Sequence, residues 1–292
     1  MNVVFNRSCH PKMPELADAS VDMIFTDPPY FQYRAQNVKG LKNHKDVVTE
    51  FEFDGFQSEK KYLSFLEDIL KEAYRVAKPG ASGYLFCADD FVSYLNRIIE
   101  AAGFKVRKVI HWHKTNPFPA ISSRKMYANS MELLIHFSKG SPATWNHKPV
   151  NEMHNYRNTA VTKSDIENLI EKYRGEDKIG HLLELMKDAL RVGTVDNLIE
   201  NPICMGKERT KHKTQKPLKV CVPFIEISSN PDDVILDPFM GAGSTAIAAL
   251  QTGRNFVGYE IDAGYCQFIQ KRFDDFLSKN PDFQGEKPVI RV

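Results

Sequence analysis

The stretch from Ile24 to Phe31, "IFTDPPYF", ends an apolar run with groups that can do chemistry. Asp27 carries an acceptor that needs a partner wherever it is buried. Pro28 and Pro29 donate no backbone hydrogen bond, so a central strand has to stop at them and the local backbone is restricted. Tyr30 adds an aromatic ring. The sequence therefore predicts a rigidly held acceptor beside a ring, at the end of a buried strand.

A second chemically suggestive stretch is the glycine turn "DPFMGAGST". Gly241 and Gly243 permit positive φ and let a ligand approach the backbone closely. A helix that begins near Ser244 offers unpaired N–H groups and the positive end of its dipole. Glu260 ends the next apolar run, where its carboxylate can accept hydrogen bonds from both hydroxyls of a ribose. The spacing thus predicts a site for a cofactor that contains a ribose.

Two cofactor classes are compatible with this turn. Gly241-x-Gly243-x-x-Ala246 followed by an acid satisfies the dinucleotide pattern, which predicts a nicotinamide-dependent oxidoreductase. Against that class, too few residues follow Glu260 for the remaining strands of a dinucleotide-binding sheet, unless the chain is permuted. The ring of Phe239, just before the turn, suits a ligand with an apolar or cationic face. S-adenosylmethionine carries the same ribose and adenine with a sulfonium in place of the pyrophosphate.

The elements that would position these groups alternate between strands and helices. Short apolar runs that end at polar or proline residues alternate with runs of helical periodicity, which predicts an α/β fold with a mainly parallel sheet. Strands are expected at 3–5, 21–27, 83–87, 106–114, 130–140, 233–239 and 255–260, and helices at 59–77, 89–104, 220–229, 244–253 and 263–278. The first helix is expected to close at Lys78-Pro79-Gly80. Residues 140–205 break the rhythm and are expected to form an insertion outside the sheet, with helices at 164–174 and 179–192.

Composition sets further limits. The 292 residues, 42% hydrophobic and 26% charged, are ordinary for a globular protein of one large domain or one domain with an insertion. No apolar run approaches the roughly 18 residues of a membrane span, and the first residues lack a secretory core, so we expect a cytoplasmic location. The five cysteines are scattered, which indicates reduced thiols and no metal site. Net charge is only +2, but basic residues gather at 105–114 and 207–216.

Three blocks together resemble a known family: "TDPPY", "HKTQKP" and "DPFMGAGST" are similar to those of exocyclic-amino DNA methyltransferases of the β arrangement. In that arrangement the catalytic half comes first, target recognition lies between, and the cofactor half comes last. The resemblance covers most of residues 3–276 except about 140–205. It implies a Rossmann-like S-adenosylmethionine-dependent fold with one antiparallel strand and helices on both faces. It also implies a catalytic domain made of 1–139 and 206–292, with 140–205 as the target-recognition insertion, and the permuted order accounts for the short remainder after Glu260.

The resemblance implies S-adenosylmethionine as the cofactor. Lys216 and Pro217 would then line its methionine end, and Asp237 would anchor the turn near its amino group. Ser8 is a departure, because family members often carry an Asp there that touches the adenine; whether the serine hydroxyl replaces that acceptor or cofactor binding is weaker stays open. The implied cofactor-binding residues are Ser8, Cys9, Lys216, Pro217, Asp237, Phe239, Gly241, Ala242, Gly243, Ser244, Thr245, Glu260 and Ile261.

The resemblance also gives the tetrapeptide a chemical role. An exocyclic base amine is a poor nucleophile because its lone pair is delocalised into the ring. Asp27 and the carbonyl of Pro28 would accept its two N–H bonds and free that lone pair, with Pro29 holding both acceptors in place. Tyr30 would stack on the base after its extrusion from the duplex. An Asp at this position is associated chiefly with adenine N6, so adenine is favoured and cytosine N4 is the alternative.

Double-stranded DNA is the implied partner, and its phosphates would meet the basic segments. The residues expected to contact DNA, the first three from a loop beside the base pocket, are Trp112, Lys114, Asn116, Arg124, Lys125, Lys211 and Lys213. For the first three, the sequence is equally compatible with a core tryptophan whose neighbours are solvated. The resemblance also allows a second copy of the chain or a restriction endonuclease as partners, and the residues alone do not exclude RNA. An oxidoreductase would leave the tetrapeptide and "TQKP" without a role, and a non-catalytic DNA-binding module would not need Asp27, Pro28 or Tyr30.

Overall fold

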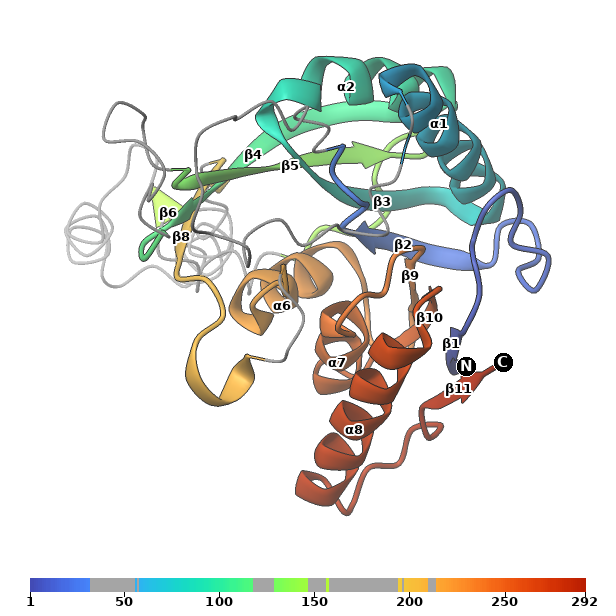
Figure 1. Cartoon of the computed structure of the whole chain (residues 1–292), viewed down its shortest axis with the longest axis vertical. Helices are drawn as coiled ribbons and strands as arrows, with labels where there is room; N and C mark the ends of the chain where they lie inside the picture. Colours follow the sequence, from blue (N-terminus) through green and yellow to red (C-terminus); the bar gives the residue numbers. More distant parts are fainter. Residues whose placement is uncertain are drawn as a thin grey trace, which may run out of the picture.

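The computed structural model describes residues 1–31, 56, 58–117, 129–146, 156–157, 194–195, 197–209 and 214–292. Within these ranges nine strands form one sheet in the order β11-β1-β10-β9-β2-β3-β5-β4-β8 (Figure 1). All neighbouring strands are parallel except that β5 runs antiparallel to both β3 and β4. The expected mainly parallel sheet with one antiparallel strand is confirmed.

The strands of this sheet are β1 (Asn2–Phe5), β2 (Val21–Thr26), β3 (Ala77–Cys87), β4 (Lys105–Lys114), β5 (Met131–Ser138), β8 (Leu198–Asn201), β9 (Val234–Asp237), β10 (Asn255–Tyr259) and β11 (Val289–Arg291). The helices are α1 (Glu59–Val76), α2 (Val92–Ala101), α6 (Leu218–Ser228), α7 (Ser244–Gln251) and α8 (Ala263–Lys279), with the short 3-10 turns η2 (Asp89–Phe91) and η3 (Gly206–Glu208). A separate two-stranded ladder pairs β6 (Tyr156–Arg157) with β7 (Thr194–Val195). The helices expected at 164–174 and 179–192 lie outside the described residues.

Helices cover both faces of the sheet, as expected. Figure 1 shows α1 and α2 on one side and α6, α7 and α8 on the other. Each group contributes buried apolar side chains to its own core cluster, the first with Leu66 and Leu95 and the second with Val220 and Ile269. No helix among the described residues combines the length and apolarity that a membrane span requires.

The centre of the sheet joins the two halves of the chain. Met23 and Ile24 of β2 pair in parallel with Ile235 and Leu236 of β9. The carboxyl ends of these two strands therefore lie side by side, and β2 continues to α1 on one face while β9 continues to α7 on the other. Ligands of α/β proteins bind at such a point, where successive connections leave the sheet on opposite sides.

The start of β3 differs from the expectation. Helix α1 is capped by Ser58, whose Oγ accepts from the backbone N–H of Lys61 (3.3 Å), and the helix ends at Val76. β3 begins at once with Ala77 rather than at residue 83. Its ladder with β2 then skips to Ser82, so Pro79 lies in an irregular stretch where a missing N–H does no harm.

The segment 140–205 is not wholly outside the sheet, which corrects the sequence interpretation. β8, near its end, pairs in parallel with β4, and Trp112 lies opposite Ile199. At its beginning, Asn146 donates from Nδ2 to the carbonyls of Glu226 and Ser229, both at 2.8 Å, at the end of α6. The target-recognition role of this segment stays a prediction.

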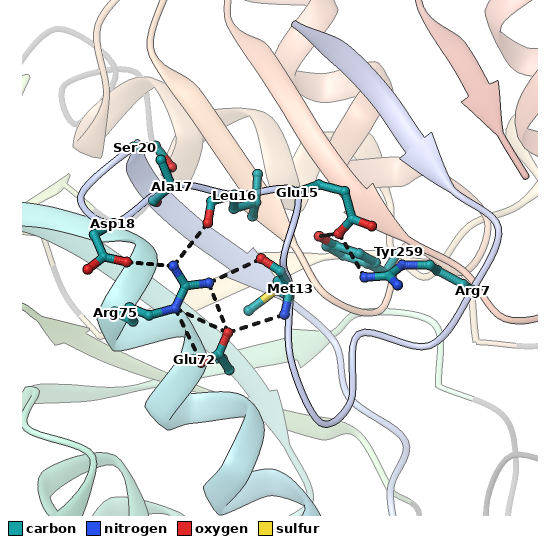
Figure 2. A network of polar contacts seen from close by, with 10 residues as sticks. All are labelled: Arg7, Met13, Glu15, Leu16, Ala17, Asp18, Ser20, Glu72, Arg75 and Tyr259. Carbon is teal, nitrogen blue, oxygen red and sulfur yellow. Dashed lines mark hydrogen bonds and ion pairs between the residues drawn. The ribbon is translucent and has the colours of Figure 1, made fainter.

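Arg75 on α1 fixes the connection between β1 and β2 (Figure 2). Its guanidinium donates to the carbonyls of Leu16 (3.0 Å) and Met13 (3.1 Å) and pairs with Asp18 (2.6 Å) and with Glu72 (2.9 Å) on its own helix. One side chain therefore holds three points of the connection against α1.

A second contact group in Figure 2 holds the same connection against the sheet. Glu15 accepts from Arg7 (2.7 Å) and from the hydroxyl of Tyr259 at the end of β10 (3.0 Å), and the Arg7 guanidinium lies 5.7 Å from the centre of the Tyr259 ring. These contacts hold Ser8 and Cys9 beside the carboxyl end of β10.

Candidate active site

A cavity of about 540 Å³ lies where β2 and β9 end. It brings together the Asp27–Tyr30 stretch, named here the base corner, and the glycine turn with Glu260, named here the cofactor corner. The predicted residues that line it are Ser8, Cys9, Asp27, Pro28, Pro29, Tyr30, Lys216, Asp237, Phe239, Gly241, Ala242, Ser244, Thr245, Glu260 and Ile261. Pro217 and Gly243 are the N-cap residues of α6 and α7, and each is next in sequence to a residue that lines the cavity. Gly243 has φ +75° there, and an added Cβ would lie 3.2 Å from Ile269, so a side chain would be both strained and crowded.

Asp237 braces the two corners against each other. Its Oδ1 accepts from the hydroxyl of Thr26 (2.7 Å), the last residue of β2, and from the N–H of Phe239 (3.0 Å). Its Oδ2 accepts from the hydroxyl of Thr245 in the first turn of α7 (2.6 Å). Burial raises the pKa of Asp237 to about 6, against these hydrogen bonds. Because both oxygens bind protein groups, Asp237 is suited to fix the geometry of the cavity.

Glu260 also lines the cavity with its carboxylate. Its Oε2 accepts from the N–H of Gly241 (2.7 Å) and its Oε1 from the N–H of Asp262 (2.8 Å). Each oxygen keeps a further acceptor position, which suits two adjacent hydroxyls of a ribose. Burial raises the pKa of Glu260 to about 7, despite those two N–H donors. The donor set of this wall fits an adenosine-type cofactor.

The raised pKa of Glu260 predicts a pH dependence of cofactor binding. A ribose diol donates to the ionised carboxylate, so affinity for S-adenosylmethionine should fall as pH drops through about 7. If only the ionised form binds, affinity at pH 6 should be about tenfold lower than at pH 8. Isothermal calorimetry across this range measures it, and Glu260→Gln, which cannot ionise, is the matched control because any titration of the cofactor itself is common to both proteins. Parallel pH curves for the two proteins would contradict the assignment of Glu260 to the diol.

Asp27 does not stand alone at the end of β2. Its Oδ2 accepts from Lys216 Nζ (2.5 Å), while its Oδ1 is buried without a hydrogen-bond partner. Burial raises the pKa of Asp27, and the ammonium of Lys216 acts in the opposite direction. Burial by itself would lower the pKa of Lys216, but the carboxylates of Asp27 and Glu132 outweigh it and raise that pKa.

Glu132 on β5 is the member of this cluster that sequence reasoning missed. It contacts Lys216 Nζ at 2.8 Å and Lys114 Nζ at 3.0 Å, and it accepts from the hydroxyl of Tyr30 (2.7 Å). Burial opposes ionisation, yet the two lysines lower the pKa of Glu132 to about 2. A carboxylate in the otherwise apolar stretch "MELLIHF" was the available signal, since a charge on a buried strand needs a partner.

The structure describes only some of the residues that were expected to contact DNA. Trp112 belongs to β4 and to the core, 1% exposed, and its Nε1 donates to the carbonyl of Asn201 (2.8 Å). The alternative of a core tryptophan is therefore confirmed, and a place for Trp112 in a pocket loop is wrong. Lys114 also belongs to β4 and pairs with Glu132, whereas Asn116 follows the strand and accepts from the N–H of Ile203 (2.7 Å). Arg124, Lys125, Lys211 and Lys213 lie outside the described residues.

Near the N-terminal strand, Ser8 is exposed at the cavity and its Oγ accepts from the N–H of His10 (3.1 Å). Cys9 is buried behind it, and burial raises the pKa of its thiol to about 12. Arg7 and Tyr265 also line this end, although neither was singled out from the sequence.

Fold and site together define an α/β protein that binds a nucleoside cofactor beside a buried carboxylate cluster. The chain belongs to the DNA methylase family, whose sequence pattern matches residues 21–271, and this confirms the resemblance seen in the sequence. Type II methyltransferase M.HinfI of Haemophilus influenzae is 26% identical over 97% of this chain and 70% of that protein.

Solved structures confirm the fold. The crystal structure of the M1.HpyAVI–SAM complex superposes with a TM-score of 0.59 at 23% identity, covering 93% of this chain and 99% of that one. PvuII DNA methyltransferase, described as cytosine-N4-specific, superposes with a TM-score of 0.63 at 15% identity, covering 98% and 94%. The expected Rossmann-like methyltransferase architecture is thereby confirmed.

Proposed function

We propose that this DNA methylase transfers a methyl group from S-adenosylmethionine to the N6 amine of adenine in double-stranded DNA. One observation carries the proposal. Asp27 and the glycine turn, more than two hundred positions apart in the sequence, line one cavity at the ends of adjacent strands. Thr26 and Asp237 link the two corners directly, so their separation is fixed before any ligand enters.

The cavity supports S-adenosylmethionine as the cofactor. Glu260 would accept from the ribose hydroxyls, and Ser8 and Cys9 would face the adenine. The aromatic ring of Phe239 lines the same cavity. The bound cofactor would supply an activated methyl group on a sulfonium. The relative M1.HpyAVI was solved as a complex with SAM, which supports the same choice here.

The residues of the tetrapeptide would prepare the base for transfer. The amine's two N–H bonds would point to the carboxylate of Asp27 and the carbonyl of Pro28, which frees the nitrogen lone pair. The N–CH₃ bond would form as the S–CH₃ bond breaks, which would leave a neutral thioether, and the cationic amine would release its proton to Asp27 or to water. Extruding the base costs on the order of a few kcal/mol, and stacking on Tyr30 returns roughly 1–3 kcal/mol.

Adenine is favoured over cytosine by the Asp that opens the tetrapeptide. The fold does not decide, because PvuII methyltransferase, described as cytosine-N4-specific, has the same architecture. Cytosine N4 is therefore the alternative substrate. Duplex DNA is the proposed partner, with a second copy of the chain and a restriction endonuclease as further candidates. The five buried, unpaired cysteines support a reducing compartment, the cytoplasm.

The test is direct. Purified protein, duplex DNA of mixed sequence and methyl-labelled S-adenosylmethionine are incubated, and the nucleosides are separated by mass spectrometry. Labelled N6-methyl-2′-deoxyadenosine supports the proposal, and labelled N4-methyl-2′-deoxycytidine replaces it with the alternative. Sequencing of modified bases in DNA from cells that express the protein then gives the recognised motif. Absence of label from DNA in the assay, together with absence of modified bases in the cellular DNA, would overturn the proposal.

A further inference from the structure

An ammonium group lies against Asp27, the carboxylate to which the proposed function assigns the substrate amine. Lys216 Nζ lies 2.5 Å from Asp27 Oδ2, at the wall of the cavity. It also lies 5.5 Å from the centre of the Tyr30 ring and 4.8 Å from that of Phe86. An acceptor carboxylate and an aromatic face are the two features that an extruded amino base requires here.

The buried ammonium of Lys216 would be destabilised without its anionic partners. The Lys216 side chain is 8% exposed, so its charge is largely removed from water and depends on its anionic partners. Asp27 Oδ1 is buried and has no partner, which leaves Oδ2 as the oxygen that makes the ion pair. Because Oδ1 is buried, an incoming base amine would approach the carboxylate at Oδ2, where it would compete with Lys216 for the same oxygen.

Glu132 offers Lys216 a second carboxylate at 2.8 Å. The same carboxylate holds the Tyr30 hydroxyl and is neutralised from its other side by Lys114. When the Lys216–Asp27 contact opens, the ammonium thus keeps a buried anionic partner without moving into water. The cluster is also balanced, with two carboxylates and two ammonium groups among the residues described here.

The backbone of Lys216 is held, so this exchange needs only a side-chain movement. Its carbonyl accepts from Ser244 Oγ (2.8 Å) at the start of α7. Arg272 on α8 donates to Ser244 Oγ (3.3 Å) and to the carbonyl of Ala242 (2.6 Å) in the glycine turn. The lysine is therefore anchored to the cofactor corner while its ammonium lies in the base corner.

We propose that Lys216 is a positioning residue whose ammonium holds the Asp27 carboxylate in place until a target base arrives, and that Glu132 retains this ammonium when the base amine takes its place. The proposal rests on the proposed function, because it assigns the same cavity to an amino base. It adds two roles to the site. Lys216 keeps Asp27 ionised, and Glu132 binds the ammonium of Lys216 when that ammonium leaves Asp27.

Opposite charge changes around Asp27 separate this role from a merely structural one. Besides Lys216, Glu132 and Tyr30, the groups that face Asp27 are Cys87 at the end of β3 and Asp237 at the end of β9, with Lys114 of β4 behind Glu132. Lys216→Met removes the nearest positive charge and Glu132→Gln removes the nearest negative one. The two variants should therefore shift the ionisation of Asp27 in opposite directions.

The first experiment is the pH profile of kcat/KM for methyl transfer to DNA. In Lys216→Met the acidic limb should move to higher pH by about 1–3 units, because Asp27 stays protonated longer. In Glu132→Gln it should move to lower pH, and the KM for DNA should rise because Lys216 has lost its alternative partner. Lys219→Met, an exposed lysine of α6, is the matched charge control and should leave the limb in place.

A second measurement does not depend on methyl transfer. The side-chain ¹³C carboxyl signal of Asp27, assigned by its loss in Asp27→Asn, is titrated in the wild type and both variants. Opposite shifts of its midpoint support the proposal even if the wild type methylates no DNA, in which case the proposed function alone fails. A uniform loss of activity with unchanged limbs and unchanged midpoints, or shifts of the same sign, would overturn the roles of Lys216 and Glu132.

Discussion

Asp27→Asn will reduce the rate of methyl transfer to DNA on the order of 10²–10³-fold while the fold and the affinity for S-adenosylmethionine are kept. This is the size of effect produced when one preorganised polar group is removed from a reacting centre. Asn has the shape of Asp but no charge, and its amide N–H₂ would oppose both Lys216 and an incoming amine. Single-turnover rates measure the chemical step, and calorimetry measures cofactor binding.

Asp275→Asn, an exposed carboxylate on α8, serves as the control for Asp27→Asn and should keep the wild-type rate. The outcome that removes Asp27 from the chemistry is a wild-type rate in a folded Asp27→Asn protein. A loss of cofactor affinity as large as the loss of rate would instead place Asp27 in the cofactor corner.

Trp112→Ala will lower the free energy of unfolding by about 3–5 kcal/mol, the usual cost of deleting a fully buried large aromatic side chain. The loss includes a cavity in the core cluster that contains Trp112, and a carbonyl of Asn201 left without its indole donor. Chemical denaturation followed by circular dichroism measures it independently of tryptophan fluorescence.

The chain supplies its own control, because its other tryptophan is exposed. Trp145 is 43% exposed, and Trp145→Ala should cost about 1 kcal/mol or less. Since Trp112 is buried, DNA affinity per folded molecule should not change in Trp112→Ala. A variant of wild-type stability with impaired DNA binding would restore the role in DNA contact that the sequence suggested for Trp112.

Local patterns predicted much of this molecule. The apolar stripe of α1, its Ser58 cap and the glycine turn before α7 all follow from residues near one another in sequence. Local patterns did not predict that Asp27 and Glu260 line one cavity. That prediction came from the resemblance to a family in which the catalytic half precedes the cofactor half.

Other features carried no local signal. The strand β8 is four residues long, lies at the sheet edge and sits in a polar stretch, so nothing in its own sequence distinguished it from a loop. The early start of β3 was hidden by Pro79, which usually ends a regular element. The ion pair of Glu132 and Lys216 joins residues that are far apart in the sequence. A charge on a buried strand predicts that a partner exists but does not identify it.

The strand order has a consequence for how the molecule is made. β1 lies between β10 and β11, the two strands of the described sheet that are farthest from it in the sequence. Figure 1 shows the two chain termini next to each other at this edge. During synthesis β1 cannot form these two ladders until β10 and β11 have been made, so the cofactor end of the described sheet closes long after β1 has emerged.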